Sequence, residues 1–472
     1  MFTEMSQVKD FIHQKTILMV DLKFSDLWGR WHHVTIPASS LNERLLEEGV
    51  GFDGSSVGFK SVHAGDMVLI PDLETGFIDP FWEVPTLSFI CNTYEAAQKS
   101  LFPGDPREVL RQAENFLKQS NVADSSVWGP EFEFYVFDHL TFTNEINAAC
   151  FRVDSSEANW NGSLEEYGHT IPLHGGYHAI PPSDQLFNLR SEMSCHLIEA
   201  GIPIKYHHHE VGGPGQCEIE TDLMPLREAA DAIMLIKYFT KMTGREHSQI
   251  VTFLPKPLFG EAGNGMHFHQ QLLLNNKNAF YDPQGPNLLS QTALHYIGGL
   301  LTHAPAVLAF TNPSTNSYRR LVPGFEAPVK TFFSSGNRSA AIRIPKYATQ
   351  PDQVRFEFRP PDATCNPYLA MAAMLMAGLD GIRNKIDPTV AGYGPINEDI
   401  FLWSPEKKKT IKSLPTSLSE ALAALKQDSD FLKVDGVFPE ILIDQWLKKK
   451  SEEEQSVRSR PHPYEIELYF DL

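Results

Sequence analysis

The chain has 472 residues, of which 42% are apolar, so it can bury more than one core and is expected to form two or three domains. Its net charge of −19 argues against a general nucleic-acid binder, because such a protein needs a basic face. An acidic substrate is not excluded, since a local group of arginines can override the total charge.

The cysteines and the apolar runs indicate a cytoplasmic protein. Five scattered cysteines without CxxC spacing are typical of reduced thiols rather than of a disulfide framework or a zinc site. The amino terminus, residues 1–4, has no basic region and no apolar stretch, so no signal peptide is predicted. The longest nearly apolar run, residues 368–379, is too short to cross a membrane and predicts a buried helix.

The first hundred residues predict a small β-rich domain. Residues 17–22 have the pattern of a buried strand, and residues 28–36 are its expected neighbour. The segment 102–106, rich in proline and glycine, predicts a boundary. We therefore expect one domain over residues 1–105 and a second over residues 106–472.

The second domain is expected to alternate strands and helices. Pro106 can open a helix over residues 107–119, because proline is tolerated in a first helical turn. Further helices are predicted over residues 226–245 and 288–302. The stretch 311–328, rich in Pro and Asn, predicts long loops, which in a compact domain are often functional.

Alternating carboxylates are the most informative chemical pattern. Glu131 and Glu133 lie two apart in an aromatic, β-branched run, so they share one face of a strand while Phe132 and Phe134 share the other. Carboxylates that point into a core repel one another unless a cation lies between them. The same alternation recurs further along the chain at Glu218, Glu220, Glu357 and Arg359. This number of oxygen ligands suits Mg²⁺ or Mn²⁺; exposed acidic faces of edge strands are the alternative.

Arginines form a second group, within 41 residues of the chain. They are Arg319, Arg320, Arg338, Arg343, Arg355 and Arg359. Guanidinium groups bind phosphate and carboxylate oxygens in pairs. Carboxylates for metal together with arginines are what phosphoryl transfer from a nucleotide requires, although surface ion pairs are the usual fate of an arginine.

A glycine-rich loop and a histidine cluster complete the candidate site. Residues 260–265 allow a close backbone approach to a ligand and lead into a strand with His267 and His269 on one face. His207, His208 and His209 precede Glu210. Zinc is one interpretation of that cluster, but the surrounding carboxylates better suit a harder ion.

Over essentially its full length the chain resembles glutamine synthetase of the bacterial type I class. The segments that carry the resemblance keep both their order and their spacing. They are residues 52–56, 129–134, 207–211, 255–260, 265–267, 312–318, 320–328, 337–339 and 366–369.

The resemblance implies two divalent ions per site. It assigns Glu133, Glu210 and Glu218 to one ion, near the glutamate and ammonium side. It assigns the second ion, near the ATP phosphates, the ligands Glu131, His267 and Glu357.

The resemblance also implies roles in substrate binding. Asp53 would bind ammonium and help to deprotonate it, and Glu326 would belong to a flap that closes the site. The residues expected to hold glutamate and the reacting phosphoryl group are Gly263, Arg320, Glu326, Arg338 and Arg359. The residues expected to contact ATP are His269, Gln271, Arg338, Arg343 and Arg355.

The implied fold is α+β, with an amino-terminal β-grasp domain followed by an α/β catalytic domain built on an antiparallel, funnel-like sheet. The family assembles as two stacked hexameric rings with active sites between subunits. Asp53 would therefore serve a neighbour's site. The implied reaction joins glutamate and ammonium at the expense of ATP, through γ-glutamyl phosphate.

Five positions depart from the family pattern. Ala262 stands where asparagine is usual, and Asn264 stands where a small hydroxyl residue is common. Gln270 and Gln271 follow His269 in an unusual pattern, and Asp352 falls where some relatives carry a lysine near ATP. These departures bear on the contacts to glutamate and nucleotide rather than on the metal ligands.

Two alternatives stay open. A related ligase could use a larger amine, although Asp53 and Ser56 favour a small cation. A relative without catalysis should have lost metal ligands, and all six are present.

Two further expectations concern assembly and regulation. The tail 463–472 alternates apolar and polar residues, which predicts a partly buried extended segment. This segment could be a last strand that packs on its own subunit, but the resemblance implies a strap that inserts into the opposite ring. Phe401 occupies the position of the tyrosine that many bacterial relatives adenylylate, so control by product feedback or by a regulatory protein is expected instead.

Overall fold

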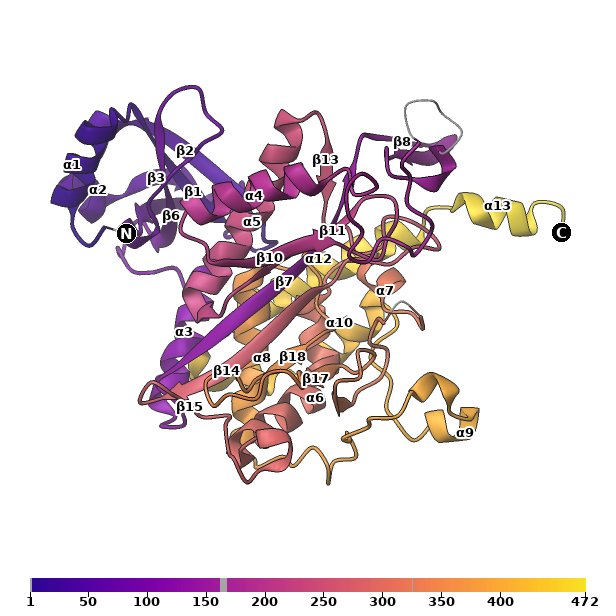
Figure 1. Ribbon diagram of the computed structural model, residues 1–472. Coiled ribbons are helices and arrows are strands. Elements are labelled where there is room, and N and C mark those ends of the chain that lie inside the picture. Colours follow the sequence, from indigo (N-terminus) through magenta and orange to yellow (C-terminus); the bar gives the residue numbers. More distant parts are fainter. Residues whose placement is uncertain (1, 162–167, 325) are drawn as a thin grey trace.

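The computed structural model describes residues 2–161, 168–324 and 326–472. Its amino-terminal part is a twisted sheet with α1 (Met5–Lys15) and α2 (Glu43–Glu48) beside it (Figure 1). The strands follow the order β2-β1-β6-β4-β3, and β5 pairs with β6. They are β1 (Met19–Ser25), β2 (Trp31–Pro37), β3 (Val50–Asp53), β4 (Asp66–Pro71), β5 (Phe77–Ile78) and β6 (Thr86–Glu95). The two strands expected first are confirmed as an antiparallel pair, each displaced by a few residues.

The second sheet carries the acidic residues. Its main path runs β10-β11-β7-β14-β18-β17-β16, and neighbouring strands are antiparallel except for the parallel pair β16 and β17. The strands are β7 (Ser125–Phe137), β10 (Ile204–His209), β11 (Gln216–Thr221), β14 (Met266–Leu274), β16 (Phe333–Ser335), β17 (Ile342–Ile344) and β18 (Phe356–Phe358). Short strands β12 (Met224–Pro225), β13 (Ile250–Thr252) and β15 (Lys277–Asn278) pair at its margins.

Helices cover the face of this sheet that carries Phe132, Phe134 and Phe268, all fully buried. The helices of this second part of the chain, not all of which lie on the sheet, are α3 (Pro106–Gln119), α4 (Phe187–Glu199), α5 (Leu226–Glu246), α6 (Gln291–Thr311), α7 (Ser317–Arg320), α8 (Pro367–Arg383), α9 (Pro405–Lys408), α10 (Leu418–Gln427), α11 (Asp430–Lys433), α12 (Glu440–Arg458) and α13 (Pro463–Tyr469). Because one face of the sheet is filled by aromatic side chains, the alternating carboxylates must face the other side.

The most apolar helix is a core helix. By length and composition α6 could cross a membrane, but 83% of its apolar window is buried inside the protein, against α8 and α10. The prediction ended this helix nine residues early, at Thr302. That prediction was wrong: Ala304 and the residues from Ala306 to Phe310 are buried, and this packing outweighs the loss of one backbone hydrogen bond at the proline.

The tail does not form the extended segment that its alternation predicted. Pro463 occupies the first turn of α13, and His462 and Glu465 form a reciprocal capping box. These local signals start a helix and override the weak alternation of apolar residues. In Figure 1 α13 projects away from the rest of the chain, as does the hairpin of β8 (His139–Glu145) and β9 (Ala148–Asp154).

Side chains connect the two sheets. Arg107, at the start of α3, donates to Asp231 of α5 at 2.6 Å and to Asp72 and Asn92 of the amino-terminal part at 3.0 and 2.7 Å. The amide of Asn366 donates to the backbone of Asp26 at 3.0 Å. The division at residues 105 and 106 stays a prediction.

Candidate active site

Strand pairing sets the carboxylates side by side. Glu131 on β7 lies between Glu220 on β11 and His267 on β14, and Glu133 lies opposite Glu218. These strands are in the middle of the sheet rather than at its edge, so the alternative of exposed acidic edge strands does not hold for them.

Glu131, His267 and Glu357 meet at one point, as predicted from the sequence for one ion. Nδ1 of His267 lies 2.8 Å from Oε1 of Glu131 and 3.5 Å from Oε1 of Glu357. One ligand atom from each of the three lies within 4.8 Å of the other two. Two carboxylates and an imidazole in this arrangement are suitable ligands for a divalent ion.

Two of the predicted arginines surround Glu357. Arg343 Nη1 lies 2.7 Å from Oε2 of Glu357, and Arg359 Nη1 donates to Oε1. Burial raises the pKa of Glu357, but Arg359 and the neighbouring histidines outweigh that effect and bring the pKa to about 2. Glu357 is therefore a carboxylate at neutral pH although it is fully buried.

The second predicted ligand set is only partly reproduced as a group. Glu218 clusters with Glu131 and Glu133, and separately with His208 and Glu210. Oε1 of Glu218 lies 3.2 Å from Nε2 of His208, and Oε2 of Glu133 accepts a hydrogen bond of 2.6 Å from the backbone of Gly265. Glu133, Glu210 and Glu218 thus line one continuous acidic region, which His208 also borders.

This region is short of positive charge. Burial and the repulsion of Glu133 raise the pKa of Glu210 to about 8. Burial, together with Glu131 and Glu210, raises the pKa of Glu218 well above its ordinary value. A divalent cation would relieve this repulsion, so the residues present fit a metal site.

A third cluster joins Glu131 to Glu220 and His269. Nε2 of His269 lies 3.6 Å from Glu131 Oε2 and 3.7 Å from Glu220 Oε1. The sequence showed the alternation of Glu218 with Glu220, but Glu220 and His208 were not among the predicted site residues. The sequence does not show which strands are neighbours. The pairing of β10 with β11, and of β11 with β7, places His208 and Glu220 beside the predicted residues.

The glycine-rich loop packs closely against the protein itself, and its approach to a substrate stays a prediction. A Cβ built on Gly263 would lie 2.4 Å from the carbonyl oxygen of Pro255 and 2.9 Å from Cγ of Arg320, so only glycine fits there. Arg320 is buried, donates to the carbonyl of Pro360 at 2.7 Å, and lies 3.4 Å from Nε2 of His267. The guanidinium of Arg320 is thereby fixed beside the metal cluster.

Arg338 and Glu326 lie together at the surface. Their charged atoms are 3.7 Å apart, and both side chains are about half exposed or more. Glu326 has a φ of 57°, in the left-handed region, which is a strained backbone for glutamate.

Two predicted ATP contacts lie at the other end of the cluster. Gln271 donates to the backbone of Asp352 at 3.2 Å, and Arg355 donates to the backbone of Gln353 at 3.0 Å. Arg355 borders a cavity of about 370 Å³ that His269 and Glu220 also line.

Asp53 is the predicted site residue that lies apart. It ends β3 in the amino-terminal sheet, away from the strands of the cluster (Figure 1). Its exposed carboxylate accepts hydrogen bonds from the backbone of Ser55 at 2.9 Å and from the hydroxyl of Ser56 at 2.7 Å. These bonds lower its pKa, so it carries a charge within its own loop.

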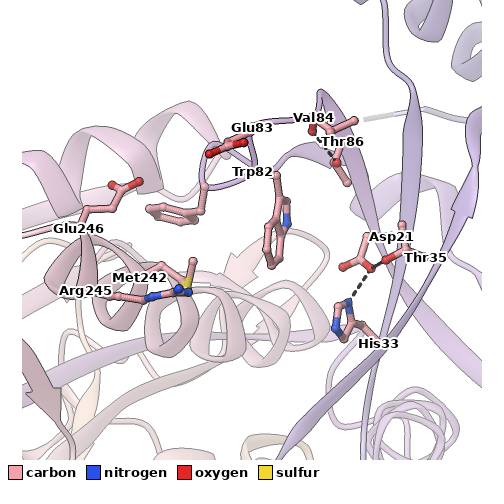
Figure 2. A pocket seen from close by; sticks show the side chains of 11 residues that line it. Asp21, His33, Thr35, Trp82, Glu83, Val84, Thr86, Met242, Arg245 and Glu246 are labelled. Atoms are coloured by element: carbon pink, nitrogen blue, oxygen red, sulfur yellow. Dashed lines mark hydrogen bonds and ion pairs between the residues drawn. The ribbon is translucent and has the colours of Figure 1, made fainter.

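A different cavity, of about 620 Å³, lies between the amino-terminal sheet and the end of α5. Figure 2 shows Trp82 at its centre, with Arg245 and Glu246 on one side and His33 bonded to Asp21 on the other. None of the acidic cluster lines this cavity.

Comparisons with known proteins agree with this geometry. The family model "Glutamine synthetase, beta-Grasp domain" matches residues 16–96, and "Glutamine synthetase, catalytic domain" matches residues 103–469. The chain belongs to the bacterial-type glutamine synthetase family. A glutamine synthetase of Frankia alni is 46% identical over the whole of both chains.

Solved structures give the same result. A glutamine synthetase of Plasmodium falciparum superposes with a TM-score of 0.88 at 28% identity and covers 99% of both chains. A structure titled as a GmaS/ADP complex has a TM-score of 0.81 at 25% identity, over 100% of both chains. The β-grasp and catalytic fold predicted from the sequence is confirmed.

Membership in this family gives the activity. The chain is a ligase that forms glutamine from glutamate and ammonium with ATP, as predicted from its motifs. Glutamine synthetases use divalent metal ions, and the acidic clusters described above have suitable ligands.

Proposed function

We propose that the acidic cluster on β7, β11, β14 and β18 is the centre at which this chain ligates ammonium to L-glutamate. The meeting of Glu131, His267 and Glu357 at one point, with Arg343 and Arg359 on Glu357, is the observation that carries the proposal. It joins metal ligands and phosphate-binding groups within one buried site.

Two Mg²⁺ or Mn²⁺ ions are the metals that these ligands suit. Glu131, His267 and Glu357 would hold the ion near the ATP phosphates, and Glu133, Glu210 and Glu218 would hold the other. When bound, the ions would neutralise phosphate charge and orient the oxygens that react.

The protein's own residues position glutamate and ATP. Arg320 and Arg359, both buried, would pair with the carboxylates of glutamate, and Gly263 would let the substrate approach closely. Arg338, Arg343 and Arg355 would bind the phosphates of ATP, and His269 and Gln271 would contact the nucleotide. Cations fixed by neighbouring carbonyls and carboxylates need little reorganisation as phosphate charge develops.

The reaction that this arrangement serves has two steps. An oxygen of the γ-carboxylate attacks the terminal phosphorus of ATP, which releases ADP and leaves γ-glutamyl phosphate. Ammonia then attacks the acyl carbon, and phosphate leaves with the electron pair of the broken C–O bond. Glu326, paired with Arg338 at the surface, would cover the site so that water does not hydrolyse the acyl phosphate.

Asp53 would take the proton that ammonium loses. In its own chain it lies away from the cluster, so the proposal requires a neighbouring subunit, as in a dodecamer of two hexameric rings.

The exposed apolar side chains of α13, among them Ile466 and Phe470, are surfaces suited to contact with another subunit. We place the enzyme in the cytoplasm, consistent with its five unpaired cysteines.

Phosphate release tests the proposal. The purified chain should release phosphate from ATP only with glutamate present, and ammonium should increase the rate and yield glutamine. Methylamine, ethanolamine and putrescine in place of ammonium test the alternative of a larger amine. Faster product formation with any of these amines than with ammonium would contradict the assignment of substrate.

A further inference from the structure

A further group of potential metal ligands lies at the surface, apart from the acidic cluster. Glu192 and His196 belong to α4, and Glu246 is the last residue of α5. One ligand atom from each of the three lies within 4.8 Å of the other two. The other groups of this kind among the described residues all include Glu131 or Glu218, whereas this one shares no residue with them. It is therefore a separate candidate site.

The fold brings these side chains together where two helices end. The helix α4 packs against α5 (Figure 1), and Glu192 and His196 are four residues apart, so they share one face of α4. Nε2 of His196 lies 3.8 Å from Oε1 of Glu192. His196 is in the last turn of α4, and Glu246 closes α5. Because the carboxyl end of a helix carries a partial negative charge, both helices favour a cation at this place.

His247 adds a fourth ligand. It follows α5 directly, and its Nε2 lies 2.8 Å from Oε2 of Glu192. Glu192 therefore has an imidazole nitrogen near each of its two oxygens. Zn²⁺ binds imidazole nitrogens and carboxylate oxygens and prefers four ligands in a tetrahedral arrangement, and this group offers two ligands of each kind. The acidic cluster, by contrast, has mainly oxygen ligands, which suit Mg²⁺ or Mn²⁺.

Aromatic packing holds one of the ligands in place. The ring of Phe81 packs edge-on against the imidazole of His196, with 5.5 Å between the ring centroids. Phe81 also contacts Phe239 of α5, so its support comes from the helix that ends at Glu246. The side chains of Glu192 and His196 are still partly exposed. A metal ion can therefore reach the ligands from solvent, and the imidazole of His196 is already oriented when the ion arrives.

Ordinary surface ion pairs are the alternative. Such pairs contribute little to stability and need no metal. In the described part of the chain, however, no lysine or arginine pairs with Glu192 or Glu246, and histidines alone approach Glu192. The negative charge of these two carboxylates thus lacks the cation that usually accompanies a surface glutamate, and a divalent ion would supply it.

We propose that four side chains at the ends of α4 and α5 bind one transition-metal ion of the Zn²⁺ class: Glu192, His196, Glu246 and His247. The bound ion would join the end of α4 to the end of α5. The strand β10 follows α4, and its His208 borders the acidic cluster. The ion would therefore stabilise a pair of helices next to the catalytic sheet without taking part in the reaction.

Equilibrium dialysis against Zn²⁺, followed by elemental analysis, tests the site. The full chain is treated with EDTA and then dialysed with saturating Mg²⁺ present. His196→Gln/His247→Gln should bind one Zn²⁺ per chain fewer than the wild type. The ligands of the acidic cluster are the same in both proteins, so the difference reports on this site alone. The control is His13→Gln/His139→Gln, which removes two exposed histidines on α1 and β8 and should bind Zn²⁺ as the wild type does.

Glu192→Gln and a spectroscopic probe give further measurements. Loss of even an outer partner of a metal ligand lowers metal affinity by about 10- to 100-fold, so loss of the Glu192 charge should weaken Zn²⁺ binding at least about tenfold. Co²⁺ in place of Zn²⁺ reports the coordination, because four-coordinate Co²⁺ absorbs visible light far more strongly than six-coordinate Co²⁺. The wild type should show a strong visible band that the double histidine variant lacks.

Equal Zn²⁺ content and affinity in the wild type and the double histidine variant would overturn the proposal. The same loss of Zn²⁺ in the control would also overturn it, because binding would then be a general property of exposed histidines. If the double variant does not fold, Glu192→Gln decides, and unchanged Zn²⁺ affinity in that variant would contradict the site. All of these outcomes are independent of the proposed function, which phosphate release tests separately.

Discussion

Nδ1 of His267 lies 2.8 Å from Oε1 of Glu131, and the two residues are direct partners across β14 and β7. The same nitrogen lies 3.5 Å from Glu357 of β18, so one histidine connects carboxylates from strands on both of its sides. Three strands far apart in sequence thus bring together three side chains that could bind one ion. A substitution of any one of these three side chains should therefore disturb the positions of the other two.

Glu357→Gln tests the phosphate side of the site. The change keeps the shape of the side chain but removes the charge that Arg343 and Arg359 contact and one predicted metal ligand. We expect activity at subsaturating metal to fall at least about tenfold. Phosphate release over a series of Mg²⁺ concentrations measures this. Glu145→Gln, in the exposed β8–β9 hairpin, is the control and should behave as the wild type. Equal activity of Glu357→Gln and the control at low metal would rule out Glu357 as a ligand.

Glu210 should make the metal-free protein less stable as the pH rises. Its pKa is raised from 4.5 to about 8 in the folded chain by burial and by Glu133. As the pH rises, Glu210 therefore loses its proton in the unfolded chain first. The contribution of Glu210 to the free energy of unfolding is fully present below about pH 4.5 and is lost progressively up to about pH 8.

Thermal unfolding in EDTA between pH 5 and pH 8 measures this effect. Glu210→Gln cannot titrate at this position, so its melting temperature should exceed that of the wild type by an increasing margin as the pH rises. Added Mg²⁺ or Mn²⁺ should stabilise the wild type more than the variant. If the melting temperatures of the two proteins in EDTA changed with pH in parallel, the pKa of Glu210 would not be raised in the folded chain.

Deletion of residues 461–472 tests the role of the tail. The helix α13 leaves Tyr464, Ile466, Leu468 and Phe470 exposed in a single chain. If these side chains bind the opposite ring, the deletion should separate dodecamers into hexamers. Light scattering measures the particle mass. A full-size particle after the deletion would show that α13 does not hold the rings together.

The sequence predicted which side chains of β7 share a face because that signal is local, whereas the grouping of ligands came from the family resemblance. Alternation placed Glu131 and Glu133 on one face of a strand, and Phe132 and Phe134 on the buried face, as the structure has them. The same pattern could not show which strands are neighbours. Glu220 and His208 therefore entered the site only when pairing brought β11 and β10 beside β7.

The failures have local physical causes. The helix predicted over residues 288–302 ended too early, because tertiary packing continues α6 past Pro305 to Thr311. The alternation of the tail favoured an extended chain, but the capping box at His462 and Glu465 starts a helix.

The last prediction concerns regulation by adenylylation. Many bacterial relatives modify a tyrosine before a Pro-Glu pair, and here that pair is Pro405 and Glu406. The corresponding residue is Phe401, which has no hydroxyl to attack an adenylyl donor, and no tyrosine occurs between residues 394 and 463. A shift of the alignment by one or two positions would not supply one. Ser404 has a hydroxyl, but it caps α9 by accepting a hydrogen bond of 3.3 Å from the backbone of Lys407.

We therefore expect that this enzyme is not adenylylated on tyrosine in that loop, and that product feedback or a regulatory protein controls it. Intact-mass analysis of protein from nitrogen-replete cells measures the modification directly. Treatment with a phosphodiesterase should leave the mass unchanged, because no adenylyl group is present to remove. An adenylyl group mapped by peptide analysis to residues 394–410 would show that another side chain in this segment takes the place of the tyrosine.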